Sequence, residues 1–164
     1  MIQPTETVRD QIVAHLPRLR RFARTLARNP HDADDLVQIA VERALVRIGQ
    51  WRPDSSLLSW LFGIVRNAWI DEGRARGRRQ RLIDTESATA DAVAPGRDTE
   101  LEIWTVQAAL ERLPEEQREA IGLVLVEGLS YREASGVLGI PIGTLTSRLA
   151  RGREALAAAL EERR

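Results

Sequence analysis

Hydrogen-bonding side chains that are short or planar, and never acidic, recur near the C-terminus of the chain: Thr144, Thr146, Ser147, Arg148 and Arg151. Ser and Thr hydroxyls let a backbone approach a groove closely, and the Arg guanidinium matches guanine edges or phosphates. Such a set suits contacts with the major groove of DNA. The alternative is the solvated polar face of an ordinary helical hairpin, because patterns of this kind have frequent false positives.

The residues around this set predict two helices joined by a tight turn. Ser130 and Glu133 form a capping box that starts the first helix. Gly139 provides the left-handed residue that ends a helix, and Pro141 prevents simple continuation. A second helix is expected from about Ile142 to the late 150s. Its buried stripe is expected to be Leu145, Leu149 and Leu156. This layout predicts a helix-turn-helix whose second helix presents the polar set to DNA.

Composition limits the class of protein. The 164 residues suffice for one domain or two small ones. There is no Cys, which excludes disulfides and thiolate metal sites. No apolar run approaches ~18 residues and no signal pattern begins the chain, so we expect a cytoplasmic protein without membrane insertion. His15 and His31 are the only histidines and lie near no plausible carboxylate pair, so neither an enzyme nor a metal or cofactor site is expected.

The formal net charge is zero, but its distribution is uneven. Segment 66–81 carries six Arg against two acids, and segment 132–153 carries four Arg against one acid. Between them, segment 84–119 carries ten carboxylates against three Arg. Because local sign matters more for DNA binding than the total, the two basic blocks are compatible with a nucleic-acid partner.

Apolar periodicity predicts helices throughout the N-terminal half. The first spans Val8–Ala27, with a kink or break expected at Pro17. The second spans Asp32–Ile48, with acids in its first turn and Gly49 as its C-terminal cap. A third runs from about Leu57 to Arg76. Its N-cap candidates are Asp54, Ser55 and Ser56, and its tryptophans Trp60 and Trp69 are expected to pack in a core.

The C-terminal half begins after a stretch without helical period. Residues 82–98 are predicted to be a flexible linker because they are rich in Ala, Thr and Asp and contain Pro-Gly. Thr99 is expected to cap a helix over Glu100–Arg112, and Pro114 to begin the next. The predicted buried side of that helix is Ile121, Val124 and Leu125. The predicted fold is all-α: two small helical bundles, 1–81 and 99–164, joined by the linker, the second containing the helix-turn-helix.

With these pieces placed, the chain resembles bacterial RNA polymerase sigma factors of the small extracytoplasmic-function (ECF) type. Four motifs carry the resemblance, in the family's order: DADDLVQIAVERAL, WRPDSSLLSWLFGIVRNAWIDEGRARGRR, LPEEQREAIGLVLVEGLSYREA and GIPIGTLTSRLARGREAL. They resemble the polymerase-docking helix, the minus-ten recognition and melting segment, the start of the fourth region and the minus-35 recognition helix. Nearly everything except the linker is covered.

The resemblance implies roles residue by residue. It assigns docking on core RNA polymerase to Asp32, Asp35, Leu36 and Gln38. Capture of a flipped minus-ten base falls to the loop of Trp51, Asp54, Ser55 and Ser56, and contact with minus-ten base pairs to Asn67. Phosphates of that region would be held by Arg74, Arg76, Arg78 and Arg79. Thr146, Ser147 and Arg151 match positions that recognise minus-35 bases, and Thr144 and Arg148 match positions that contact the DNA backbone.

The resemblance also implies promoter DNA as a ligand, an anti-sigma factor as a controlling partner and a part in stress-responsive initiation. The chain departs from the family pattern at Thr146, where Arg or Lys is usual, and at Ser135, where Ala is usual. Thr146 cannot make a bidentate guanine contact, so an altered or weaker minus-35 preference is expected. Two other readings remain: a sigma-like mimic that sequesters an anti-sigma factor, and a stand-alone helix-turn-helix repressor.

Overall fold

The computed structural model describes residues 4–82 and 98–162, and these ranges contain helices and no strand. In chain order the helices are α1 (Pro4–Leu26), α2 (Pro30–Val46), η1 (Ile48–Gln50), α3 (Leu57–Leu82), α4 (Asp98–Glu111), α5 (Glu115–Ile121), η2 (Gly122–Val126), α6 (Tyr131–Leu138) and α7 (Ile142–Glu161). The predicted all-α class is confirmed. The predicted linker lies almost wholly in 83–97, outside the described residues.

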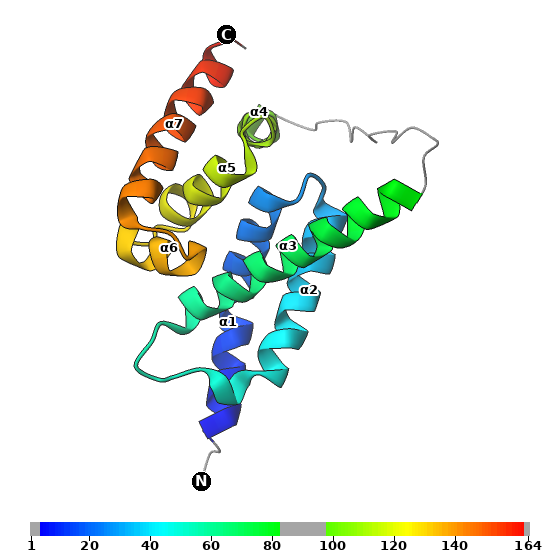
Figure 1. Ribbon diagram of the computed structural model, residues 1–164, viewed down its shortest axis with the longest axis vertical. Coiled ribbons are helices and arrows are strands. Elements are labelled where there is room, and N and C mark those ends of the chain that lie inside the picture. The colour runs from blue at the N-terminus through cyan, green and yellow to red at the C-terminus, as the bar shows by residue number, and fades with distance from the viewer. Residues whose placement is uncertain (1–3, 83–97, 163–164) are drawn as a thin grey trace.

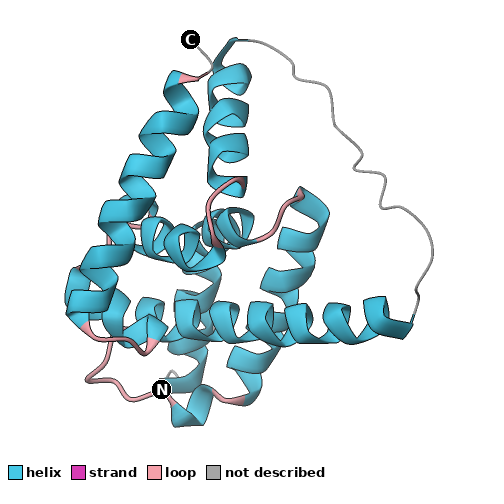
Figure 2. Ribbon diagram, turned by 45° about the horizontal axis from the view of Figure 1, so that its top comes forward, coloured by secondary structure: helices cyan, strands magenta, loops and turns pink. Residues whose placement is uncertain are grey.

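The helices form two bundles that lie against each other (Figures 1 and 2). The first consists of α1, α2 and α3, with α3 crossing the other two. The second consists of α4 to α7, and its α5, η2 and α6 contact α1 and α3. One cluster of buried apolar side chains continues from the first bundle into the second, so the two bundles share a core in this conformation.

The contact between the bundles is tight around Phe22. Its ring meets Phe62 edge to face, with ring centres 5.1 Å apart, and both side chains are fully buried. Gly122 of η2 approaches the same place so closely that an added Cβ would lie 2.9 Å from Thr25 Cγ2. A side chain at position 122 would therefore push the bundles apart.

Helix boundaries differ from prediction where local caps decide them. α2 starts earlier because the Asn29 side chain accepts a hydrogen bond from the Asp32 amide at 2.8 Å. It ends at Val46, and Gly49 lies inside the 3-10 turn η1, so the predicted Gly49 cap is wrong. In α3, Ser56 Oγ accepts from the Ser59 amide at 3.2 Å, which confirms it among the N-cap candidates.

Pro17 does not break α1, which runs on from Pro4 to Leu26. Proline removes one amide donor and leaves the carbonyl four residues earlier without its helical partner. That carbonyl belongs to Val13, whose residue is 62% exposed, so water can solvate it. The predicted break fails because the proline lies on the solvent side of an otherwise well-anchored helix.

α3 is longer than predicted, and α4 begins earlier than predicted. α3 extends to Leu82, six residues past the expected end at Arg76. Thr99 lies within α4 instead of capping it. Trp60 and Trp69 are half-buried against the core, as their spacing predicts.

The helix-turn-helix is built as predicted. Ser130 Oγ accepts from the Glu133 amide at 3.1 Å and the Glu133 carboxylate accepts from the Ser130 amide at 3.3 Å. Gly139 adopts the left-handed conformation with φ 64°. Leu145 and Leu149 are buried. Before this motif, however, the chain takes a π-helical turn, η2, which rotates Leu125 outward to 45% exposure and overturns its predicted burial.

Candidate nucleic-acid and polymerase interfaces

The exposed face of α7 carries the minus-35 candidates. Thr146 and Ser147 are exposed, and their hydroxyls donate to carbonyl oxygens one turn back, Ile142 O at 2.9 Å and Gly143 O at 3.1 Å. These bonds use the hydroxyl protons but leave oxygen lone pairs that can accept from base amino groups. Arg151 is exposed on the same helix, whereas Thr144 is half-buried. Three of the five candidates are thus presented to solvent together.

Arg148 is held differently. Its side chain is 20% exposed and its Nη2 lies 3.5 Å from Glu116 Oε1 of α5. This ion pair and the partial burial of the side chain limit how far the guanidinium can move. Such an arrangement suits contact with a fixed phosphate better than adaptive recognition of bases.

The loop assigned to base capture is only partly available. Trp51 is half-buried against the core, and its indole Nε1 is buried without a hydrogen-bond partner. Asp54, Ser55 and Ser56 are exposed, with Ser55 Oγ donating to Arg52 O at 2.8 Å. In this conformation the loop presents a carboxylate and two hydroxyls, while the tryptophan faces inward.

Asn67 lines a cleft of about 880 Å³ between the two bundles. Ser55, Ser56 and Asn67 line one side of this cleft, and Arg132 and Gly136 of α6 line the other. Asn67 is exposed within this cleft. The structure therefore brings the minus-ten candidates of α3 and its preceding loop to one surface, and that surface faces the helix-turn-helix.

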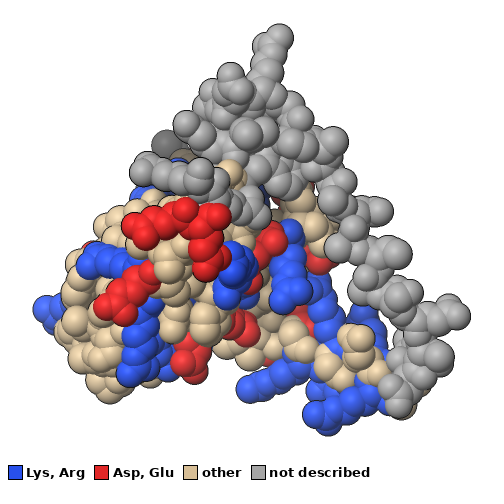
Figure 3. All heavy atoms as spheres, turned by 90° about the horizontal axis from the view of Figure 1, so that it is seen from above, with Lys and Arg blue, Asp and Glu red and all other residues tan. Residues whose placement is uncertain are grey.

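The C-terminal half of α3 carries the arginines expected to hold phosphates. Arg74, Arg78 and Arg79 are exposed. Basic side chains gather at the lower right of Figure 3. Arg76 differs, because its Nη2 lies 3.2 Å from Asp32 Oδ2 and its guanidinium stacks 5.6 Å from the Trp69 ring centre. Arg76 is thus engaged within the first bundle.

The polymerase-docking candidates surround a hollow of about 340 Å³ on α2, with the side chains of Asp32, Asp35 and Gln38 at its rim. Asp35 and Gln38 are exposed, and Asp32 is half-buried. Leu36 lines the hollow from below at 2% exposure, so it anchors the helix more than it offers a surface. The rim is acidic and amide-bearing, as suits a basic partner.

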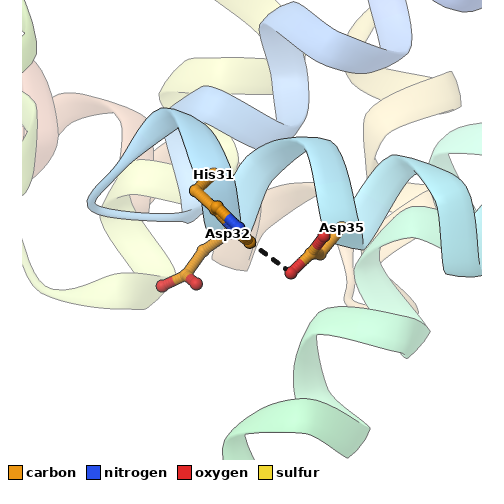
Figure 4. Close-up of side chains that lie close together, drawn as sticks. All are labelled: His31, Asp32 and Asp35. Carbon is orange, nitrogen blue, oxygen red and sulfur yellow. Dashed lines mark ion pairs between the residues drawn. The ribbon is translucent and has the colours of Figure 1, made fainter.

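His31, Asp32 and Asp35 bring one donor atom each within 4.8 Å of one another (Figure 4). Each already has a partner in the protein: His31 Nδ1 lies 3.2 Å from Asp35 Oδ2, and Asp32 accepts from Asn29 at 2.8 Å. One ion pair and one hydrogen bond thus engage these side chains within the protein.

The charged side chains that join the two bundles were not predicted from the sequence. The Glu127 side chain, 0% exposed, accepts from Arg21 Nε at 2.7 Å and Nη2 at 2.9 Å, and from Arg18 Nε at 3.1 Å. The signal was present: Glu127 interrupts the apolar run LVLVEGL, where a carboxylate must find a buried partner. What the run could not show is that the partners lie on α1.

A second buried carboxylate joins the bundles. Glu119 of α5 lies 3.2 Å from Arg66 Nε of α3, and its residue is 3% exposed. Burial raises the pKa of the Glu119 carboxyl, and the charge of Arg66 offsets only part of that effect. Nearby, the Trp69 indole donates to Glu115 at 2.6 Å. The contact therefore combines buried ion pairs with apolar packing around Phe22.

Among the described residues, no helix is both long enough and apolar enough to cross a membrane.

Known proteins resemble this chain along both bundles. Residues 12–79 match the family model described as Sigma-70 region 2, and residues 103–156 match Sigma-70, region 4. The chain is 42% identical over 156 residues to the ECF RNA polymerase sigma factor EcfG of Rhodopseudomonas palustris, covering 95% of this chain and 86% of that one. It is 40% identical over 146 residues to SigM of Mycobacterium tuberculosis, covering 87% of this chain and 71% of that one.

Two solved structures also match this chain over most of its length. The sigma factor RpoE of Bartonella quintana, in complex with the anti-sigma factor NepR, matches with a TM-score of 0.85 and 34% identity, covering 94% of this chain and 97% of that one. CnrH, in complex with the cytosolic domain of CnrY, matches with a TM-score of 0.73 and 27% identity, covering 96% and 89%.

Proposed function

This chain belongs to the sigma-70 family of RNA polymerase sigma factors, in its ECF group, and we propose that its two bundles divide the work of such a factor. It binds core RNA polymerase and directs promoter recognition and transcription initiation. Residues 1–81 dock on the polymerase and recognise and melt the minus-ten element. Residues 99–164 recognise the minus-35 element, and residues 82–98 join the two.

One observation supports this division above others: two separate exposed polar surfaces occur in one chain, each inside the matching family segment. Asn67, Ser55 and Ser56 share a surface within the first segment. Thr146, Ser147 and Arg151 share the exposed face of α7 within the second. A stand-alone repressor needs only the second surface, so the first favours a factor that contacts promoter DNA at two elements.

The α2 rim supports docking on the polymerase. Asp35 and Gln38 are exposed and Asp32 is half-buried beside them, at the N-terminal half of a helix that a buried Leu36 fixes in place. An acidic, rigid edge of this kind suits an Arg-rich partner surface. The role of Leu36 in this proposal is to hold the edge, and the three polar residues make the contact.

Control by an anti-sigma factor is supported by the whole-chain likeness to RpoE. That likeness extends over both bundles at once, so the relative placement of the bundles resembles that of RpoE bound to NepR. A regulator that covers both bundles would meet a chain already in a compatible arrangement. Regulation of transcription, without catalysis by this chain itself, is the role that follows. A sigma-like mimic would not need exposed Arg74, Arg78 and Arg79 beside the minus-ten surface.

The test is transcription from a promoter library with purified core polymerase and this chain. We expect polymerase to initiate only when the chain is present, at promoters that share a minus-ten and a minus-35 element. Failure to bind core polymerase would favour the repressor. Binding without initiation, together with tight binding to an anti-sigma factor, would favour the mimic.

A further inference from the structure

An ion pair between α2 and α3 sets the register of the side chains around it. Arg43 of α2 donates from Nη1 to Asp71 Oδ2 of α3 at 2.7 Å. Residues four apart on a helix share one face, so Arg47 follows Arg43 on α2, and Asn67 precedes Asp71 on α3. Both Arg47 and Asn67 line the cleft of about 880 Å³. The position next to the ion pair thus places an arginine on the same surface as an uncharged amide.

The charge of Arg47 is not balanced by a neighbouring carboxylate. Its side chain is exposed, and within the described part of the chain it makes no ion pair or hydrogen bond. Arg43, one turn earlier, is neutralised by its carboxylate partner. Arg66 of α3 is also engaged, with its Nε 3.2 Å from Glu119 Oε1. Arg47 therefore brings an uncompensated positive charge to this surface of the first bundle.

A single strand of nucleic acid would bring charge of the opposite sign to the same surface. Ser55, Ser56 and Asn67 are exposed there and offer hydroxyl and amide groups to a base edge. Every base is attached to a backbone whose phosphates are negatively charged. The arginines predicted to hold phosphates begin at Arg74, about 10 Å along α3 from Asn67. Arg47 supplies a cation on the surface of the base contacts themselves.

We propose that Arg47 binds a phosphate of the minus-ten strand, beside the base that Asn67 and the two serines contact. This inference rests on the proposed function, from which it takes the assignment of the minus-ten surface. All of these residues belong to the first bundle, so the contact does not depend on where the second bundle lies. A phosphate contact positions the strand and carries no sequence information. Arg47 thus adds affinity for the strand, and Asn67 adds preference for its sequence.

A purely structural role for Arg47 predicts a different result. Arg47 is the C-terminal cap residue of α2, and its backbone amide donates to Arg43 O at 3.0 Å. A cation at a helix C-terminus is stabilised by the helix dipole, so an arginine with no other role would stabilise α2. Its replacement would then lower the free energy of unfolding and leave the response of DNA binding to salt unchanged.

The test measures binding of a fluorescent single-stranded minus-ten oligonucleotide to core polymerase saturated with the chain, at several salt concentrations. We expect Arg47→Gln to lower the affinity about two- to fivefold, the range of an exposed ion pair. The slope of log K against log salt concentration should become less steep by about 0.7, the contribution of one phosphate contact on a single strand. Arg47→Lys keeps the charge and should restore the slope. Arg153→Gln removes the same charge from an exposed position of α7 and, as the matched control, should change neither quantity.

A second measurement changes the DNA instead of the protein. In a series of oligonucleotides, one phosphate at a time is replaced by an uncharged methylphosphonate. We expect one replacement to weaken binding of the parent chain about as much as Arg47→Gln does, and to have no further effect in that variant. Arg47→Gln should weaken binding of a matched and a mismatched minus-ten sequence by the same factor, whereas Asn67→Ala should reduce the difference between the two sequences.

An unchanged slope in Arg47→Gln, or a series without any phosphate whose effect depends on Arg47, would overturn the proposal. So would a loss of affinity that disappears when more chain is added, because Arg47 would then act on polymerase binding. The proposed function is judged on the parent chain alone. If core polymerase saturated with the parent chain does not prefer the matched oligonucleotide, the minus-ten assignment fails. If that preference is present and the slope is unchanged in Arg47→Gln, only the role of Arg47 fails.

Discussion

Arg76 Nη2 lies 3.2 Å from Asp32 Oδ2, and this pair joins the C-terminal half of α3 to the start of α2. The Arg76 guanidinium also stacks 5.6 Å from the Trp69 ring centre, so it is held from two sides. An arginine expected to bind phosphate is thereby placed where it orients Asp32, an acid of the edge proposed to dock on the polymerase. The two roles proposed for the first bundle meet at this contact.

Replacing Arg76 should therefore affect polymerase binding. We expect Arg76→Gln to weaken affinity for core polymerase up to about fivefold, the range of a partly exposed ion pair. Arg79→Gln, which changes an exposed arginine of the same helix, should leave that affinity unchanged and weaken DNA binding. Titration of each labelled variant with core polymerase measures its affinity for the polymerase. Equal losses of that affinity in the two variants would contradict the division of roles.

Asn67 tests the minus-ten assignment. Asn67→Ala should slow formation of open complexes about ten- to hundredfold, the worth of one bidentate contact to a base, while polymerase binding stays intact. Reactivity of minus-ten thymines to permanganate reports opening. Ser59→Ala alters the same cleft and serves as the control. Normal open complexes from Asn67→Ala would remove the assignment.

A substitution at Thr146 that adds a base contact tests the minus-35 assignment. Thr146 is exposed on α7, and its hydroxyl proton is used by Ile142 O, so it can offer a base only an acceptor, and Thr146→Ala should weaken the minus-35 preference modestly. Thr146→Arg introduces a group that can bond guanine O6 and N7, and we expect discrimination at one minus-35 position to rise by about 1–3 kcal/mol. Selection from randomised minus-35 sequences measures it. An unchanged preference would place position 146 away from the bases.

Gly122 tests the packing between the bundles. Gly122→Ala would bring a methyl group 2.9 Å from Thr25 Cγ2 and 3.3 Å from Phe22 Cε2, and neither side chain can withdraw freely. We expect the free energy of unfolding to fall by about 1–3 kcal/mol in urea titrations. Gly136→Ala on α6 meets nothing within 4 Å, and should raise stability by about 0.4–1 kcal/mol. A neutral Gly122→Ala would show that the contact yields easily.

Glu119 gives a pH dependence with a definite sign. Because burial raises its pKa in the folded state, the folded chain holds this proton to a higher pH than the unfolded chain does. The contribution of Glu119 to stability is therefore largest below its unfolded pKa and is lost as pH rises through the raised folded pKa. Urea unfolding of the parent and Glu119→Gln should show a parent advantage that grows as pH is lowered from neutral toward the ordinary range of a carboxyl. An advantage that shrinks instead would mean that the Arg66 pair dominates.

The local structure of the second bundle follows from short signals in the sequence. Ser130, Glu133 and Gly139 define the start and end of α6 by direct hydrogen bonds and by a left-handed backbone, and no distant residue is needed. The stripe of Leu145 and Leu149 is equally local, since its spacing alone turns both toward one side. These elements could be predicted because their causes lie within a few residues.

The relation between the bundles could not be predicted in the same way. Arg18 and Glu127 are separated by 109 residues, and no periodicity relates them. The π turn η2 also has no mark in the apolar pattern, so Leu125 was expected to be buried. The break predicted at Pro17 was wrong for a different reason. Proline removes one helical hydrogen bond, but tertiary packing holds α1 together and the unpaired carbonyl is exposed to water.

The widened turn of η2 makes segment length matter as much as residue identity. Each residue of an α-helix advances the chain by about 100° around its axis. Dropping a single residue between Gly122 and Val126 would let ordinary α-helical winding resume, and Glu127 would swing about a quarter turn from the arginines of α1. Insertion or deletion of one codon there would keep an intact helix-turn-helix but would break its ion pairs with α1. A change in the length of η2 would therefore require a compensating change in the facing helix α1.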